Sequence, residues 1–229
     1  MPNTYPERFS EIRERVISAA QKSGRTGGEI TVIAVAKTAT PDTLKEAWGS
    51  GQLVFAHNRV QALKEHYEVL PDATWHLIGP LQRNKARKAV TMASVIQTVA
   101  SQAMAKQIDL LASELRKDPL PVLLQVNLTP DDGRAGLRKE QIPNLLEEIQ
   151  GFTHLKANGL MTLGPHRAPK DALRSHFSAL REISQELQGL KLLPLTSELS
   201  MGMSNDYEIA VEEGATLVRI GRALFPLTP

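Results

Sequence analysis

The hydrophobic pattern divides this chain into short apolar runs that alternate with amphipathic segments. The clearest run is Ile30–Lys37, in which six of the first seven residues are apolar and four of those six are β-branched. A run without polar alternation is typical of a strand buried on both faces, as in a parallel sheet. Seven further runs, of which the one at 195–199 is the weakest, predict strands at residues 51–58, 75–78, 94–99, 121–127, 154–161, 195–199 and 215–220.

Segments with helical periodicity lie between these runs. The first covers residues 9–20 and precedes the first strand, so it is an extra element or a cap, and Ser23-Gly24 ends it. Thr40, followed by a proline, and Ser101 are good helix-starting residues. The remaining helices are expected at residues 41–49, 60–67, 82–90, 101–115, 142–149, 173–187 and 204–213.

Eight strands alternating with helices in 229 residues indicate a (β/α)8 barrel, here with an extra N-terminal helix. No linker or low-complexity segment interrupts the pattern, so we expect residues 1–229 to form a single domain. An open doubly wound sheet is the alternative architecture. The chain lacks the glycine-rich first turn that such a sheet usually carries.

The composition excludes several classes of protein. A formal net charge of +2 is too small to argue for nucleic acid or an anionic membrane as partner. The absence of cysteine excludes disulfides, thiol nucleophiles and zinc–thiolate sites. The first residues form no apolar signal core, and no apolar run approaches the length of a membrane span. We therefore expect a cytoplasmic protein that binds neither nucleic acid nor membrane.

Lys37 is the first candidate for chemistry. It ends the first strand just before a strand-to-helix loop, which is where α/β folds place their ligands. Partial desolvation at such a position favours the neutral, nucleophilic amine, as in a lysine that forms a Schiff base. The alternative is a lysine whose charged end reaches out of the strand end into water, and this stretch alone does not decide between them.

Gly221-Arg222, after the last strand, lies where barrels often hold a phosphate group on backbone N–H groups. The loop 200–204 after the seventh strand offers more donors, with Ser204 as the expected N-cap of the next helix. Glycine after a strand is also common for turn reasons alone. A lysine after strand one and a phosphate cup after strands seven and eight together suggest pyridoxal 5′-phosphate.

Several short motifs occur in the order in which a known family has them, and they support pyridoxal 5′-phosphate as the ligand. They are Ala34-Val-Ala-Lys-Thr38, Asn58-Arg-Val-Gln61, Trp75-His-Leu-Ile-Gly-Pro-Leu-Gln82 with Asn84-Lys85, Asn158-Gly-Leu-Met161, and Leu199-Ser-Met-Gly-Met-Ser204 with Val218-Arg-Ile-Gly221. From about residue 30 to the end, the chain closely resembles the pyridoxal phosphate homeostasis protein family. These proteins are small relatives of the alanine racemase barrel domain.

The resemblance implies a set of cofactor-binding residues: Lys37 as the cofactor lysine, Ser200, Gly221 and Arg222 around the phosphate, Asn58 and Met201 beside the ring or its phosphate, and Arg219 opposite the pyridine nitrogen. Two segments depart from the family pattern. Ala56-His57-Asn58-Arg59 replaces Gly-Glu-Asn-Tyr, and Arg222 replaces a threonine. The second departure removes a hydroxyl donor, although the backbone N–H remains and a guanidinium can add charge-assisted contacts.

Three classes of function fit these residues. The first, which we favour, is a monomeric protein that holds pyridoxal phosphate without robust catalysis, with pyridoxal phosphate-dependent apoenzymes as candidate recipients. The second is an amino-acid racemase or decarboxylase. By the resemblance, a racemase needs a tyrosine from a C-terminal domain, but the sequence ends at Pro229 and none of its tyrosines is predicted to end a strand. The third is a Schiff-base aldolase, for which we expect a lysine on a later strand.

Other residues are given ordinary roles. His57 and His76 are not at metal-ligand spacing with a second histidine or a carboxylate, so no metal is expected. The basic run between residues 83 and 88 is interpreted as a solvated helix face, because no aromatic residues interleave it.

Overall fold

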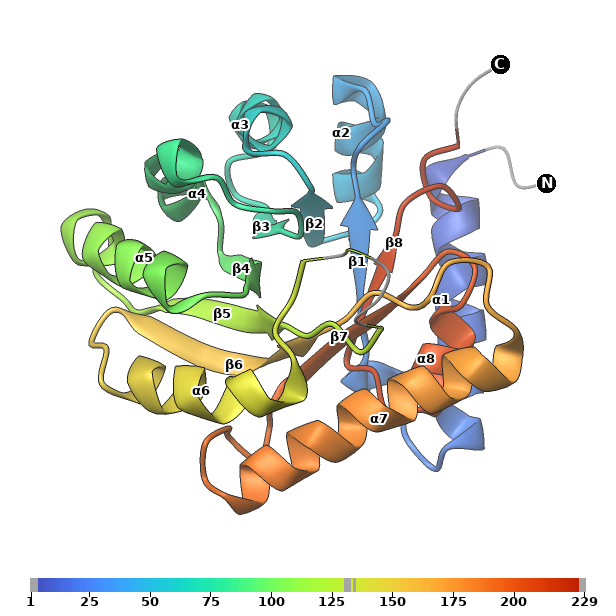
Figure 1. The fold of residues 1–229 in the computed structure, drawn as a ribbon. Coiled ribbons are helices and arrows are strands. Elements are labelled where there is room, and N and C mark those ends of the chain that lie inside the picture. The colour runs from blue at the N-terminus through green and yellow to red at the C-terminus, as the bar shows by residue number, and fades with distance from the viewer. Residues whose placement is uncertain (1–3, 130–132, 134, 227–229) are drawn as a thin grey trace.

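Eight parallel strands close into a barrel in which each strand pairs with the next along the chain and the last pairs with the first. The structure is a computed structural model that describes residues 4–129, 133 and 135–226. The (β/α)8 barrel predicted from the sequence is confirmed, and the open doubly wound sheet is excluded. Figure 1 shows the strands at the centre with the helices around them.

The strands are β1 (Thr31–Val35), β2 (Val54–His57), β3 (Thr74–Leu77), β4 (Val95–Val99), β5 (Leu120–Gln125), β6 (Leu155–Met161), β7 (Glu198–Met203) and β8 (Leu217–Ile220). The α-helices are α1 (Tyr5–Lys22), α2 (Pro41–Gly49), α3 (Val60–Val69), α4 (Ala86–Met92), α5 (Gln102–Leu115), α6 (Ile142–Gln150), α7 (Lys170–Gly189) and α8 (Tyr207–Glu212). Short 3-10 turns are η1 (Gly27–Glu29), η2 (Arg83–Lys85) and η4 (Lys139–Gln141). Among the described residues, no helix is both long enough and apolar enough to cross a membrane.

The period-two alternation of each strand sorts its side chains into two layers. The larger layer lies between the strands and the helices and includes Val32 and Ala34 of β1. The smaller one fills the barrel interior with alternate strand residues: Ile33, Val35, Ala56, Leu123, Met161 and Leu217. This double burial is why β1 reads as a continuous apolar run rather than an alternating one.

The seventh strand does not lie where the sequence predicted it. The prediction was residues 195–199, but β7 is Glu198–Met203 and the side chain of Leu195 is 86% exposed. Pro194 precedes a turn that keeps Leu195 out of the sheet, with the Ser197 N–H bonded to the Pro194 carbonyl. β7 contains no β-branched residue, so its conformation comes from pairing with β6 and β8 rather than from local preference.

Three helix details also differ from the predictions. The helix expected at 204–213 begins at Tyr207 with Asp206 as its N-cap, so Ser204 is not the cap. The helix expected at 82–90 divides into η2 and α4. Ile17, counted with the apolar face of α1, is 39% exposed. The expected N-caps Thr40 and Ser101 do accept hydrogen bonds from backbone N–H groups in the first turns of their helices.

The N-terminal helix α1 holds the loop that follows β8. Arg8 Nε donates to the Leu224 carbonyl at 2.9 Å, and the ring of buried Tyr5 lies 5.2 Å from that of Phe225. Helix α1 also packs along α8. The helix that the sequence presented as an extra element or cap therefore fixes one edge of the barrel mouth.

A pair of histidines, one buried and one half-buried, lies between β2 and α3. His57 Nε2 and His66 Nδ1 are 2.7 Å apart, and the His57 ring stacks on Trp75. Burial, with help from the positive charges of His66 and Lys37, lowers the pKa of His57 to about 3. Phe55, on the same strand face as His57, belongs to the layer outside the barrel, so His57 points toward α3 rather than into the interior.

This pair predicts a loss of stability in mild acid. Because the pKa of His57 is about 3 in the folded protein and about 6.5 in an unfolded chain, stability is fully present above pH 6.5 and falls as the pH drops toward 3. His57 alone should remove about 3 kcal/mol from the free energy of unfolding between pH 6.5 and 4. Urea unfolding across that range should show a shallower decline for His57→Gln than for wild type.

The control is His166→Gln, because His166 is exposed. Equal pH slopes for wild type and His57→Gln would show that His57 is not held neutral by the fold.

Candidate functional site

The residues that follow β1, β2 and β8 lie together at one mouth of the barrel. All strands are parallel, so their C-terminal ends lie at the same end of the barrel. β1 lies between β2 and β8. Lys37 and Arg222 are exposed there, while Asn58 and Gly221 are half-buried. The expectation that the protein alone partly desolvates Lys37 is wrong, since the side chain is open to solvent.

The loops after β1 and β8 are joined directly. Thr38 Oγ1 donates to the Phe225 carbonyl at 2.9 Å. In the β8 loop, the N–H groups of Leu224 and Phe225 both donate to the Gly221 carbonyl, at 2.9 and 2.8 Å. The chain therefore makes a tight turn directly after Gly221, and that turn is fixed to the residue next to Lys37.

The contacts around Gly221 show that the fold itself does not require a glycine there. A Cβ built on Gly221 would meet only Val35, at 3.5–3.9 Å, which is ordinary van der Waals contact, and the backbone there is not in the left-handed region. The packing of the chain therefore does not require glycine at this position. A turn that begins with glycine allows a phosphate group to approach its backbone N–H groups closely.

Ser204 is a site residue that the sequence assigned to a different role. Its Oγ accepts a long hydrogen bond of 3.4 Å from the Ala223 N–H, which places a hydroxyl beside the turn after Gly221. A bulge in β7 allows this arrangement, because the register with β8 shifts between Ser200 and Met203. Gly202 makes the bulge possible: its φ is +89°, and a Cβ there would lie 2.6 Å from the Cβ of Ala210. The small-residue motif around Gly202 was the available signal.

Two predicted residues present different groups from those expected. The side chain of Met201 is buried in the layer outside the barrel, so only its backbone remains for a ligand at the mouth. Ser200 is fully buried and points into the barrel rather than into the phosphate cup.

Asn58 packs against the loop after β3, where a Cβ on Gly79 would lie 2.0 Å from the Asn58 carbonyl oxygen.

A chain of polar side chains crosses the barrel interior, and we call it the polar floor: His76, Gln97, Ser200 and Arg219. Arg219 Nη1 donates to Ser200 Oγ at 2.5 Å, and its Nη2 donates to the Thr162 carbonyl at 2.8 Å. Ser200 Oγ donates to Gln97 Oε1 at 2.7 Å, and Gln97 Nε2 lies 2.8 Å from His76 Nδ1.

Burial lowers the pKa of Arg219 to about 10, which still leaves it positively charged near neutral pH. Arg219 and Ser200 were predicted from the sequence as site residues, whereas Gln97 was not. Its signal was a lone amide within the apolar run at 94–99.

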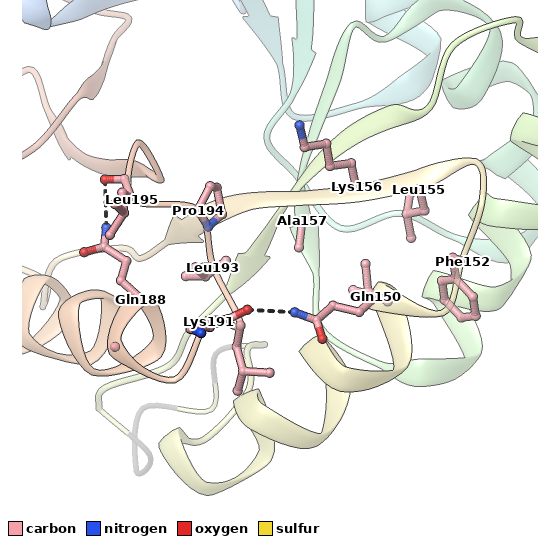
Figure 2. A pocket seen from close by; sticks show the side chains of 13 residues that line it. Gln150, Phe152, Leu155, Lys156, Ala157, Gln188, Lys191, Leu193, Pro194 and Leu195 are labelled. Carbon is pink, nitrogen blue, oxygen red and sulfur yellow. Dashed lines mark hydrogen bonds between the residues drawn. The ribbon is translucent and has the colours of Figure 1, made fainter.

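An apolar groove of about 630 Å³ lies at the opposite end of the barrel (Figure 2). It is formed by the C-terminal ends of α6 and α7 and the start of β6, and Gln150 Nε2 donates to the Lys191 carbonyl at 2.9 Å across it. None of the residues that the sequence predicted to bind a cofactor lines this groove. The groove is therefore separate from the site at the mouth.

Comparison with known proteins gives a consistent result. A family model of the alanine racemase N-terminal domain matches residues 12–229. The pyridoxal phosphate homeostasis protein of Aquifex aeolicus is 35% identical over 223 residues, covering 96% of this chain and 96% of the relative. The protein of the same name from Escherichia coli K12 is 32% identical, covering 97% of this chain and 96% of the relative.

Solved structures show the same relationship. PipY of Synechococcus elongatus, in a structure with PLP bound, has a TM-score of 0.84 and 36% identity, with 97% of this chain and 100% of that chain covered. An alanine racemase of Clostridium difficile has a TM-score of 0.74 at 13% identity, with 95% of this chain and 57% of that chain covered, which shows the fold alone. This chain therefore belongs to the pyridoxal phosphate homeostasis protein family, with the fold of the alanine racemase N-terminal domain.

Proposed function

We propose that this protein binds pyridoxal 5′-phosphate at the barrel mouth, on Lys37, and retains it in the cytoplasm as a monomer without robust catalysis. One observation carries the proposal: Lys37 and the turn after Gly221 lie at the same mouth of the barrel, and the protein's own packing does not require a glycine at position 221. Membership of the family supports it, and so does PipY, a relative whose structure contains PLP. Pyridoxal phosphate-dependent apoenzymes are the proposed recipients.

The residues of the mouth supply complementary groups. When bound, the cofactor supplies an aldehyde that a lysine amine can attack and a dianionic phosphate. Lys37 supplies the exposed amine. The backbone at Gly221 and Arg222 would supply N–H groups, Ser204 supplies a hydroxyl, and the exposed Arg222 adds a guanidinium that can pair with phosphate oxygens. Asn58 and the backbone of Met201 would contact the ring or its phosphate from either side.

The groups needed for proton transfer at an amino-acid Cα are poorly represented. Arg219, opposite the ring nitrogen in this proposal, can donate a hydrogen bond but cannot readily release its proton, so it holds the nitrogen unprotonated. The three tyrosines lie on α1, α3 and α8, and none ends a strand. Burial raises the pKa of Tyr207 to about 12 and also raises that of Tyr5, so neither serves as a base near neutral pH.

Replacing Lys37 tests the covalent attachment. Lys37→Ala should lose the visible absorption that pyridoxal phosphate gives on an amine, while the phosphate contacts retain part of the cofactor. Borohydride reduction of the wild-type complex, followed by peptide mass spectrometry, should place the added mass on Lys37. Lys45→Ala is the matched control, because Lys45 is an exposed lysine on α2. A labelled peptide elsewhere, with the absorption of Lys37→Ala unchanged, would reject this attachment site.

Replacing Gly221 tests the phosphate position. Gly221→Val should weaken pyridoxal phosphate binding at least about tenfold, because losing one charge-assisted hydrogen bond costs about 1.5–3 kcal/mol. Gly221→Ala should also weaken pyridoxal phosphate binding. It should leave the urea unfolding midpoint unchanged, since its Cβ meets only ordinary contacts. Equilibrium dialysis measures the affinity, and Gly49→Ala, with open space around its Cβ, is the control. Unaltered affinity in both Gly221 variants would place the phosphate elsewhere.

A hydrogen-exchange assay tests the absence of robust catalysis. Wild-type protein loaded with cofactor should exchange the α-proton of alanine in deuterated water negligibly, because neither a protonated ring nitrogen nor a placed tyrosine is available. Proton NMR of alanine over hours provides the measurement. Exchange on the order of one per second or faster would establish a racemase-type enzyme instead.

A further inference from the structure

The polar floor has a fixed hydrogen-bond direction. A guanidinium has no acceptor, so Arg219 must donate to Ser200 Oγ. The hydroxyl then donates its own proton to Gln97 Oε1, and this orients the amide so that Nε2 faces His76 Nδ1. An amide nitrogen only donates, so His76 Nδ1 must accept, and the single ring proton lies on Nε2.

The surroundings of His76 support the same protonation state. A doubly protonated ring would direct an N–H at the amide N–H of Gln97, which is a donor facing a donor. His76 is 5% exposed, and burial lowers its pKa to about 4. Near neutral pH the hydrogen bonds of the polar floor therefore all point one way, from the positively charged Arg219 to the neutral imidazole of His76.

Among the residues that the structure describes, the buried cation of the floor donates its hydrogen bonds to neutral groups. Ser200, Gln97 and the Thr162 carbonyl, which receive or continue the hydrogen bonds of Arg219, are all neutral. The acid whose charge acts on Arg219 is Asp206, whose Oδ1 accepts the Met203 N–H and whose pKa is raised by burial. Neutral acceptors fix the guanidinium in place without cancelling its charge.

We propose that Gln97 and His76 are positioning residues that hold Arg219, through Ser200, in the orientation and charge state required to donate to an acceptor atom of the ligand at the barrel mouth. The ligand assignment rests on the proposed function above. A carboxylate at position 97 would have nearly the same shape as the amide. It would, however, add a negative charge that only the Ser200 hydroxyl separates from the guanidinium. It would also have no proton to donate to His76, so the hydrogen bond between residue 97 and His76 would have to run in the opposite direction.

Nitrogen-15 NMR of the histidine rings at neutral pH tests the direction without a ligand. His76, identified as the ring signal lost in His76→Gln, should be neutral with its proton on Nε2. A proton on Nδ1 would mean that the amide of Gln97 is turned round, and a doubly protonated ring would mean that no donor faces Nδ1. Either result overturns the proposal.

The matched variant is Gln97→Glu, with Gln21→Glu as the control, because Gln21 is exposed on α1 and the charge change is the same. In Gln97→Glu, His76 should gain a second proton at neutral pH, and pyridoxal phosphate affinity should fall at least tenfold. The control should change neither. A folded Gln97→Glu protein with wild-type affinity would show that Gln97 has no positioning role, even if His76 becomes charged.

Two further comparisons separate the possible failures. If wild-type protein binds no pyridoxal phosphate, the proposed function fails, and with it the ligand part of this proposal, while the ring spectra still decide the direction of the chain. If Gln97→Glu does not fold, Gln97→Met replaces it: the affinity should fall and His76 should stay neutral. Unchanged affinity in a folded Gln97→Met protein would likewise overturn the proposal.

Discussion

β8 pairs with β1 over four residues, from Leu217 opposite Thr31 to Ile220 opposite Ala34, and this pairing closes the barrel. In an open sheet whose strands followed chain order, the loops after the first and last strands would lie at opposite edges. Closure instead sets Lys37 beside Gly221, and the Thr38 hydroxyl then joins the two loops through the Phe225 carbonyl. The arrangement of the mouth thus depends on a backbone register, with side chains adding the final positioning.

The second constraint is the charge buried under the mouth. A cation in an apolar barrel costs free energy unless its donors find acceptors, and among the described residues Arg219 donates to a hydroxyl and to a backbone carbonyl. The apolar residues Ile33 and Leu217 share the same interior and exclude water from it. The barrel therefore provides a fixed positive group of low mobility directly under the position proposed for an aromatic ring.

The parts of this structure that could be predicted are those determined by local sequence. β1 could be read directly because an apolar run in which four of six apolar residues are β-branched is typical of a doubly buried strand. β7 could not, because its residues acquire strand geometry from β6 and β8, and its glycine bulge decides which serine reaches the mouth. Ser200 and Met201 precede the bulge, and strand alternation turns the first inward and the second outward, so the motif located the site without showing which groups face it.

The two departures from the family pattern have different consequences in this fold. His57 faces away from the barrel interior and packs on Trp75 and His66, so its replacement of a family glutamate changes the β2–α3 packing rather than the contents of the mouth. Arg222 is exposed beside the turn after Gly221, where its guanidinium can reach an anion that the turn holds. One departure alters an acid-sensitive contact, and the other adds positive charge at the proposed phosphate position. With the tyrosines on helices, both departures are compatible with the proposal that the protein retains an anionic cofactor rather than transferring protons.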